Sequence, residues 1–145
     1  MISLGLAQKL KISGLIWNAA KHDSFVIPDR GMDDLIFVLS DMAVFIEKIR
    51  GRLTVTFHGT PEWALDDILV SEVIWLPNEA QLRELLEMRL VTESQPAFKL
   101  MNTADGYLCE IKFQGQAMQF EAFGASDAYG LALLHCLENE ASKLS

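Results

Sequence analysis

The sequence contains little cysteine and no long uninterrupted hydrophobic run. Its 145 residues include two cysteines, Cys109 and Cys136. Two cysteines are too few for a disulfide scaffold, so we expect two buried thiols in a reducing compartment. No run reaches the roughly 18 apolar residues that a membrane span needs. Lys9 and Lys11 interrupt the N-terminal apolar stretch that a signal peptide would keep continuous. These absences predict a cytoplasmic protein that does not use a membrane.

Positive charge is also scarce, with 12 basic against 20 acidic residues and a net charge of −8. The segment after Pro77 is the more acidic part, with 5 basic and 10 acidic residues. A protein that binds nucleic acid through its phosphates needs a local concentration of positive charge. The three cations near the N-terminus, Lys9, Lys11 and Lys21, are spread out as on a solvated helix face. The charge distribution therefore disfavours a nucleic-acid partner.

Half of the residues are hydrophobic, which is enough for a substantial core. The clearest pattern lies between Asp105 and Phe123, where apolar and polar residues alternate with period two. Such alternation predicts strands with one buried face. Gln114-Gly115 interrupts the alternation and predicts a tight hairpin turn, because glycine adopts positive φ readily. The apolar positions are Tyr107, Cys109, Ile111 and Phe113 in the first strand and Met118, Phe120 and Ala122 in the second.

Other elements flank this hairpin on both sides. A turn at Asp105-Gly106 joins an earlier strand, Ala97 to Met101, and completes a three-stranded meander. Asn78 and Gln81 have the spacing of a capping box and predict a helix before the strands. Ser126 is the predicted N-cap of a helix that follows them. The expected order after Pro77 is therefore helix, three strands, helix.

This order resembles the double-stranded-RNA-binding domain, which is similarly α-β-β-β-α. The matching pieces are Pro77 and Leu82 at the first helix, Pro96-Ala97-Phe98 at the first strand, and Gly124-Ala125-Ser126 before the last helix. The resemblance implies the topology of the C-terminal half. In that family, lysines just after the serine grip phosphates, but this chain has Asp127 and Ala128 there. The resemblance therefore does not extend to the residues that bind RNA.

The N-terminal half is expected to mix helices with short strands. The segment 33–49 has an acidic start, a basic end and Gly51 just beyond it, which predicts a long helix. Its Ile, Val and Phe content also permits a strand at 35–39 followed by a shorter helix. The remaining expected elements are helices at 4–20 and after Thr60, and strands at 24–27, 53–57 and 73–76. We expect an α+β protein with subdomains 1–77 and 78–145, or one integrated body of both.

The sequence offers one weak catalytic candidate. His58 lies between a predicted strand and a predicted helix, where functional sites often collect, and Asp66 or Asp67 could orient it as a base. No nucleophile motif or phosphate-binding glycine loop accompanies it, so a turn histidine is the simpler interpretation. The histidines show no zinc spacing. We therefore predict no metal and no cofactor, and retain a small hydrolase centred on His58 as an alternative.

Three tryptophans are candidates for a binding surface. Trp17, Trp63 and Trp75 could anchor a protein interface, because tryptophan is enriched at interface hot spots, although each also fits a core position. With no convergent catalytic residues, the leading hypothesis is a non-catalytic interaction or accessory module. Its expected partner is another protein or a second copy of the chain. A nucleic-acid-binding module of the α-β-β-β-α type is the other alternative.

Overall fold

The structure is a computed structural model and describes residues 1–40, 44–57 and 68–143. It confirms a mixed α+β fold with three-stranded antiparallel sheets. The chain divides into two compact units: unit 1 comprises residues 1–15 and 77–145, and unit 2 comprises residues 16–76. The sequence predicted a division after Pro77 that left the first helix in the N-terminal part. The structure instead places that helix in unit 1, with the C-terminal residues.

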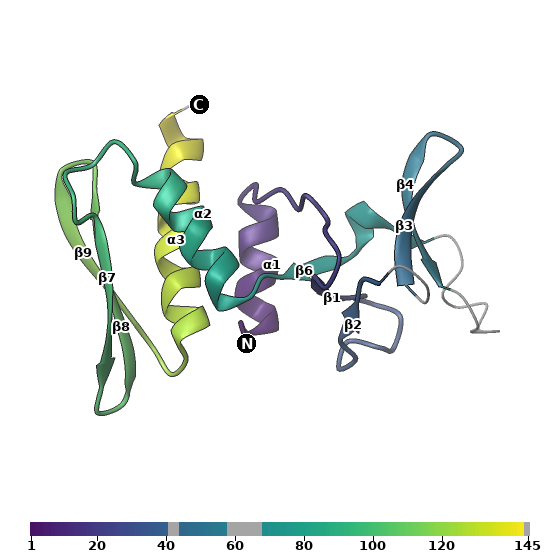
Figure 1. Cartoon of the computed structure of the whole chain (residues 1–145), viewed down its shortest axis with the longest axis horizontal. Helices are drawn as coiled ribbons and strands as arrows, with labels where there is room; N and C mark the ends of the chain where they lie inside the picture. The colour runs from purple at the N-terminus through teal and green to yellow at the C-terminus, as the bar shows by residue number, and fades with distance from the viewer. Residues whose placement is uncertain (41–43, 58–67, 144–145) are drawn as a thin grey trace. The chain divides into compact units, whose positions relative to one another are not determined.

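Unit 1 contains the meander expected from the sequence. Strands β7, β8 and β9 are antiparallel, in that order across the sheet, and helix α3 follows them (Figure 1). Helices α2 and α3 lie on the same side of this sheet (Figure 1). The bounds are α1 Leu4–Ile12, α2 Glu79–Arg89, β7 Phe98–Thr103, β8 Gly106–Phe113, β9 Gln116–Ala122 and α3 Ala125–Lys143.

The β8–β9 turn explains the register of the hairpin. Gln114 and Gly115 have φ of 53° and 77°, the positive values that a two-residue type I′ turn requires. The turn pairs Phe113 with Gln116, and the pairing continues to Tyr107 opposite Ala122. This register confirms the predicted alternation, because Cys109, Ile111 and Phe113 are all buried on one face.

The core of unit 1 lies between that face and the helices. Leu82 and Leu86 of α2 and Leu133 of α3 are fully buried. Helix α1 packs on α3 where Gly130 leaves room for it. A Cβ at Gly130 would lie 2.7 Å from Leu6 Cδ2 and 3.3 Å from Ile2 Cδ1. This close packing is the reason that α1 belongs to unit 1.

One of the two predicted helix caps is confirmed. Asn78 accepts a hydrogen bond from the Gln81 backbone N–H at 2.8 Å, and the Gln81 side chain accepts one from the Asn78 N–H at 2.9 Å. The prediction that Ser126 caps α3 is wrong, because the helix already begins at Ala125 and Ser126 is buried in its first turn. Asp127 instead accepts a hydrogen bond from the backbone N–H of Ser3 at 2.7 Å.

Unit 2 consists of short strands in two three-stranded antiparallel sheets. The first sheet has the order β2-β1-β6 and the second has the order β3-β4-β5. A short 3-10 turn, η2, separates β5 from β6. The bounds are β1 Ser24–Val26, β2 Phe37–Val38, β3 Val44–Ile49, β4 Arg52–Phe57, β5 Ile68–Leu69, η2 Val70–Glu72 and β6 Ile74–Leu76.

Two predicted helices, over 33–49 and 4–20, are corrected. Of the helix predicted after Thr60, the residues up to 67 lie outside the described residues, and Ile68–Leu69 form strand β5 instead. The helix predicted over 33–49 is wrong, because Phe37–Val38 and Val44–Ile49 are strands. The alternative was right about a strand within 35–39 and wrong about a helix after it. Branched and aromatic side chains fit a pleated sheet better than a helix. The first helix ends at Ile12 rather than Ala20, since Gly14 has a φ of 103° and stops it.

Among the described residues, one buried aromatic ring, Phe25, lies in the core of unit 2 with partly buried aromatic rings packed against it. Phe25 is fully buried, and its ring centroid lies 5.7 Å from both Trp17 and Phe37. The Trp17 indole N–H donates to the carboxylate of buried Asp23 at 2.9 Å. Other buried members of this cluster are Ile27, Leu39, Val55, Ile68 and Val73.

Candidate functional site

The outer face of the β7–β8–β9 sheet, opposite α2 and α3, is the candidate functional site. Strand alternation that buries Cys109 and Ile111 turns Glu110 and Lys112 to this outer face. Their cross-strand neighbours on the same face are Lys99 on β7 and Ala117 and Gln119 on β9. The face is therefore a mixed polar surface carried by a rigid sheet.

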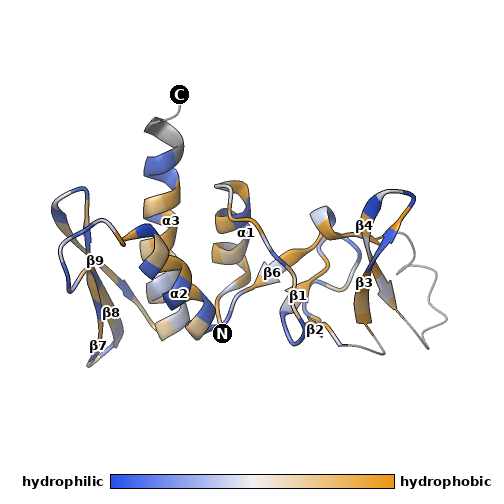
Figure 2. Cartoon of the chain, turned by 45° about the horizontal axis from the view of Figure 1, so that its top comes forward, coloured by the Kyte–Doolittle hydropathy of each residue, from blue (hydrophilic) through white to orange (hydrophobic). Residues whose placement is uncertain are grey.

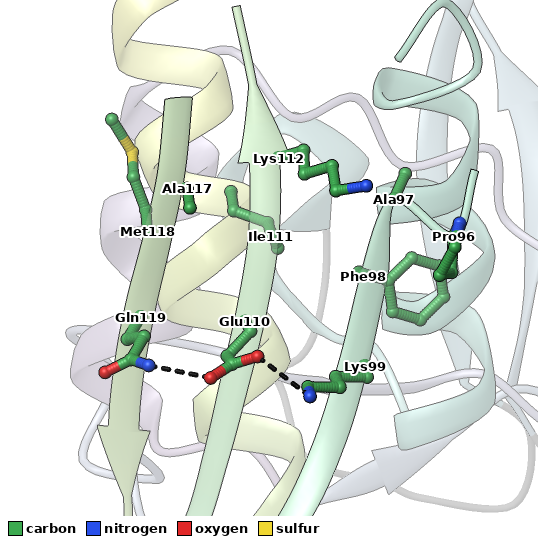
Figure 3. A pocket seen from close by; sticks show the side chains of 10 residues that line it. All are labelled: Pro96, Ala97, Phe98, Lys99, Glu110, Ile111, Lys112, Ala117, Met118 and Gln119. Atoms are coloured by element: carbon green, nitrogen blue, oxygen red, sulfur yellow. Dashed lines mark hydrogen bonds and ion pairs between the residues drawn. The ribbon is translucent and has the colours of Figure 1, made fainter. Parts of the chain in front are cut away.

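Glu110 ties the three strands together across this face (Figure 3). Its carboxylate accepts a hydrogen bond from Gln119 Nε2 at 2.7 Å and lies 3.2 Å from Lys99 Nζ. The three side chains form a ladder perpendicular to the strands. Opposite charges and hydrogen-bonding groups on facing strands stabilise a sheet by several tenths of a kcal/mol per pair, so the ladder is mainly structural.

A shallow hollow of about 520 Å³ lies beside this ladder. Residues from all three strands line it, and Lys112 extends over it (Figure 3). The lining combines the small apolar side chain of Ala117 with the polar ends of Lys99 and Gln119. Such an open, mixed surface suits contact with a polypeptide. It contains no cysteine, serine or histidine that could act as a nucleophile or general base.

Strand β9 forms an edge of the sheet at this hollow. It pairs with β8 on one side and with no strand of the described chain on the other. In a hairpin closed by a two-residue turn, Gln116 is a hydrogen-bonded partner of Phe113, and such pairs then alternate along β9. Gln116, Met118, Phe120 and Ala122 therefore bond to β8. The N–H and C=O groups of Ala117, Gln119 and Glu121 point away from β8.

The edge carries few of the devices that protect natural edge strands. β9 has no proline, no lysine and a single charged residue, Glu121, over seven residues. Met118 and Phe120 on its inner side are only half-buried. Neither Glu121 nor Lys112 forms an ion pair with any residue in the described ranges. The edge therefore combines free backbone groups, incompletely covered apolar side chains and one charge, Glu121, without an ion pair in the described chain. A second such charge, Lys112, lies on the neighbouring strand β8.

The structure does not describe the catalytic candidate from the sequence. His58, Asp66 and Asp67, as well as Trp63, lie outside the described residues, so the hydrolase hypothesis stays a prediction. Within the described ranges, no three His, Cys, Asp or Glu side chains are grouped closely enough to hold a metal ion.

The other two tryptophans lie together in unit 2. The ring centroids of Trp17 and Trp75 are 6.3 Å apart, and the rings are stacked with an interplanar angle of 12°. The Trp17 N–H is used by Asp23. The buried Nε1 of Trp75 has no hydrogen-bond partner in the part of the chain described. Trp17 packs against the core cluster of unit 2 and Trp75 stacks on Trp17, and their role in binding a partner stays a prediction.

The two cysteines are free and fully buried in unit 1. Burial, with a smaller contribution from Glu110, raises the pKa of Cys109 to about 11. Burial, with a contribution from Glu140, raises the pKa of Cys136 to about 12. Both thiols are therefore protonated at neutral pH and poor nucleophiles.

Sequence reasoning missed two surface features. The free edge of β9 was missed because the predicted meander gives its last strand one neighbour but does not reveal whether another part of the chain pairs with its other side. The second is a basic hairpin tip with exposed Lys48, Arg50 and Arg52, which Figure 2 colours as hydrophilic. This tip was missed because the segment was interpreted as the end of a helix.

Comparison with known proteins gives no relative from which a function could be inferred. No family model matches the chain, and neither a curated protein nor a solved structure does. The resemblance to a double-stranded-RNA-binding domain therefore stays a prediction. In the described ranges, none of the helices is both long and apolar enough to span a bilayer.

Proposed function

We propose that this chain is a non-catalytic protein-interaction module that binds a polypeptide strand along the free edge of β9. The free edge is the observation that carries the proposal. An extended partner strand would satisfy the outward N–H and C=O groups of Ala117, Gln119 and Glu121. Main-chain hydrogen bonds supply affinity in this mode of recognition, and neighbouring hollows supply specificity.

The hollow beside β9 supports the same mode. It reaches the sheet edge at Ala117, Met118 and Gln119, so side chains of an added strand would adjoin it on the outer face. On the inner face, the same strand would cover Met118 and Phe120. The proposal includes a cytoplasmic location, where the two free cysteines would remain reduced.

The test removes one outward N–H from the edge. Ala117→Pro deletes a donor that faces away from β8, and edge strands tolerate proline where the N–H faces solvent. Isotopically labelled protein, dilute enough to rule out self-association, is placed in an unlabelled extract of its native host. Amide exchange is then followed by NMR. We expect at least tenfold slower exchange at Gln119 and Glu121 in extract than in buffer, and no such slowing in Ala117→Pro.

Matched controls separate loss of binding from loss of folding. Ala117→Ser changes the side chain and keeps the N–H, so it should behave like the unmodified protein. If Ala117→Pro lowers the melting temperature, Glu121→Pro replaces it, because its N–H also faces outward. Equal exchange at the edge in extract and in buffer would contradict the proposal, provided that the purified protein also shows no protection at high concentration.

A further inference from the structure

We infer that the strand that binds the β9 edge is the β9 strand of a second copy of this chain. The inference rests on the proposed function and names the partner of the same edge. Antiparallel pairing of β9 with its own symmetry mate would join two three-stranded sheets into one six-stranded sheet about a twofold axis. Twofold contacts of this kind, in which one patch binds itself, are the commonest in homo-oligomers.

Backbone geometry restricts the register of such a pair. The twofold axis can pass beside any residue of β9, because directly opposed residues alternate between hydrogen-bonded and non-hydrogen-bonded pairs. Centring on Met118 or Phe120 would leave two residues at one end of β9 unpaired. If the twofold axis passed between two adjacent residues, each inner-face side chain of one copy would lie opposite an outer-face side chain of the other. Neither face of the joined sheet would then match. Centring on Glu121 would set the two carboxylates directly opposite each other, which is unfavourable. Centring on Ala117 would set Glu121 opposite a residue on the far side of the β8–β9 turn, which belongs to β8 and cannot pair with it.

Only the register centred on Gln119 uses the whole strand. It pairs all seven residues of β9, with Gln116 opposite the partner copy's Ala122 and Gln119 opposite its own equivalent. On the inner face, Met118 meets Phe120 of the second copy, so the half-buried side chains on this face cover each other. Two apolar rows thereby become continuous beneath the joined sheet.

Charge complementarity supports this register on the outer face. Ala117 lies opposite Glu121 of the second copy, and Lys112 is the cross-strand neighbour of Ala117 on β8. The Lys112 side chain extends toward β7 in Figure 3, and the small Ala117 side chain leaves room for it to turn toward β9 and meet the carboxylate. Both groups lack an ion pair within the described chain. Because of the twofold symmetry, the ion pair between Lys112 of one copy and Glu121 of the other forms twice. Each of these charges therefore gains a partner in the dimer.

Charge exchange tests the pairing. In light scattering coupled to size-exclusion chromatography, we expect a mass approaching twice the 16.2 kDa of the monomer as concentration rises. Lys112→Glu or Glu121→Lys alone should weaken the dimer, raising its dissociation constant about 5- to 30-fold, because each breaks two modest ion pairs. The combined Lys112→Glu/Glu121→Lys variant should recover most of the affinity. The matched control, Lys9→Glu/Glu84→Lys, makes the same charge changes on exposed helix positions and should leave dimerisation unchanged.

The outcomes distinguish this inference from the proposed function. A purified protein that stays monomeric up to about 1 mM contradicts the second copy as partner. If neither Lys112→Glu nor Glu121→Lys changes the dissociation constant of the dimer, the register is contradicted. If the monomer nevertheless gains edge protection in host extract, the module binds a different protein strand, and the proposed function stands alone. If the edge amides are protected neither in host extract nor in the concentrated purified protein, both the proposed function and this inference are contradicted.

Discussion

The two units of this chain reach stability by different routes. Unit 1 has a meander whose strands, six to eight residues long, pair with their neighbours in sequence, and helices of up to 19 residues cover it. Unit 2 has strands of two to six residues, and its β1 pairs with β6, which sets Ser24 opposite Leu76. Pairing strands that are neighbours in sequence closes only a short loop and loses little chain entropy. Pairing strands that are far apart in sequence closes a long loop, and this entropy is lost before the contacts form.

The cores of the units differ in the same sense, although both units leave several large hydrophobic side chains exposed. The short strands of unit 2 bury few side chains each, and its core is a small cluster in which Phe25 is the one buried aromatic ring among the described residues. Long regular elements spread the burial in unit 1 over many aliphatic residues. A single core residue should accordingly matter more to unit 2 than to unit 1.

Core truncation should reveal this difference most strongly. Phe25→Ala removes the ring that both Trp17 and Phe37 contact, and we expect a loss of about 3–5 kcal/mol. Leu133→Ala in α3 should cost about 2–5 kcal/mol, toward the lower end because neighbouring aliphatic side chains can relax. Hydrogen exchange followed by mass spectrometry should show lost protection in unit 2 for the first variant and in unit 1 for the second. Uniform loss in both units would mean that they unfold as one.

Glycine substitutions give a smaller, local comparison. Gly106 has a φ of 146°, and a Cβ there would collide with the backbone oxygen of Ala122 and lie 2.9 Å from Phe123 Cα. We expect Gly106→Ala to destabilise unit 1 by about 3 kcal/mol, since strain adds to the collision. Gly51 in the β3–β4 turn also has positive φ, 79°, but open space around it. Gly51→Ala should cost unit 2 about 1 kcal/mol, from backbone strain alone. Denaturant titration of both variants would check the ratio, and equal losses would show that the collision is relieved by local movement.

Alkaline pH should weaken unit 1 selectively. All cysteines and tyrosines of the chain lie in unit 1, and burial raises the pKa of Cys109 and Cys136 above the ordinary value of 9.0. Above pH 9 the unfolded chain releases these thiol protons while the folded chain retains them, so the free energy of unfolding falls as pH rises. At pH 9.5 we expect a loss of about 1–2 kcal/mol relative to pH 7.

A variant isolates the thiols from other groups that titrate in this range. Cys109→Ala/Cys136→Ala should show a shallower decline in stability between pH 8 and about pH 10 than the unmodified chain. Amide exchange would locate the decline in unit 1. A decline of the same slope in both proteins would assign it to other groups.

The elements of unit 1 were predicted from the sequence more successfully than those of unit 2. In unit 1 the alternation from Tyr107 to Ala122, the Gln114-Gly115 turn and the Asn78 capping box are local signals, and local hydrogen bonds enforce them. The segment 33–49 in unit 2 combined helix-like charged ends with strand-forming side chains, and pairing with other parts of the chain decided the outcome. The candidate site depends on which strand lacks a neighbour on one side, which is a property of the assembled sheet. Nothing in the sequence alone therefore indicated that Lys112 and Glu121 belong to the candidate site.

Unit 2 is inserted between α1 and α2 of unit 1, which has a consequence for synthesis on the ribosome. Helix α1 is synthesised before unit 2, but Gly130, the position on α3 against which Leu6 packs, is made more than a hundred residues after α1. Every strand of unit 2 is synthesised in the interval, so unit 2 can be complete while α1 still waits with Leu6 and Leu10 uncovered. A nascent chain halted within this interval would display the apolar face of α1. Such a face is a natural substrate for chaperones that hold unfinished proteins.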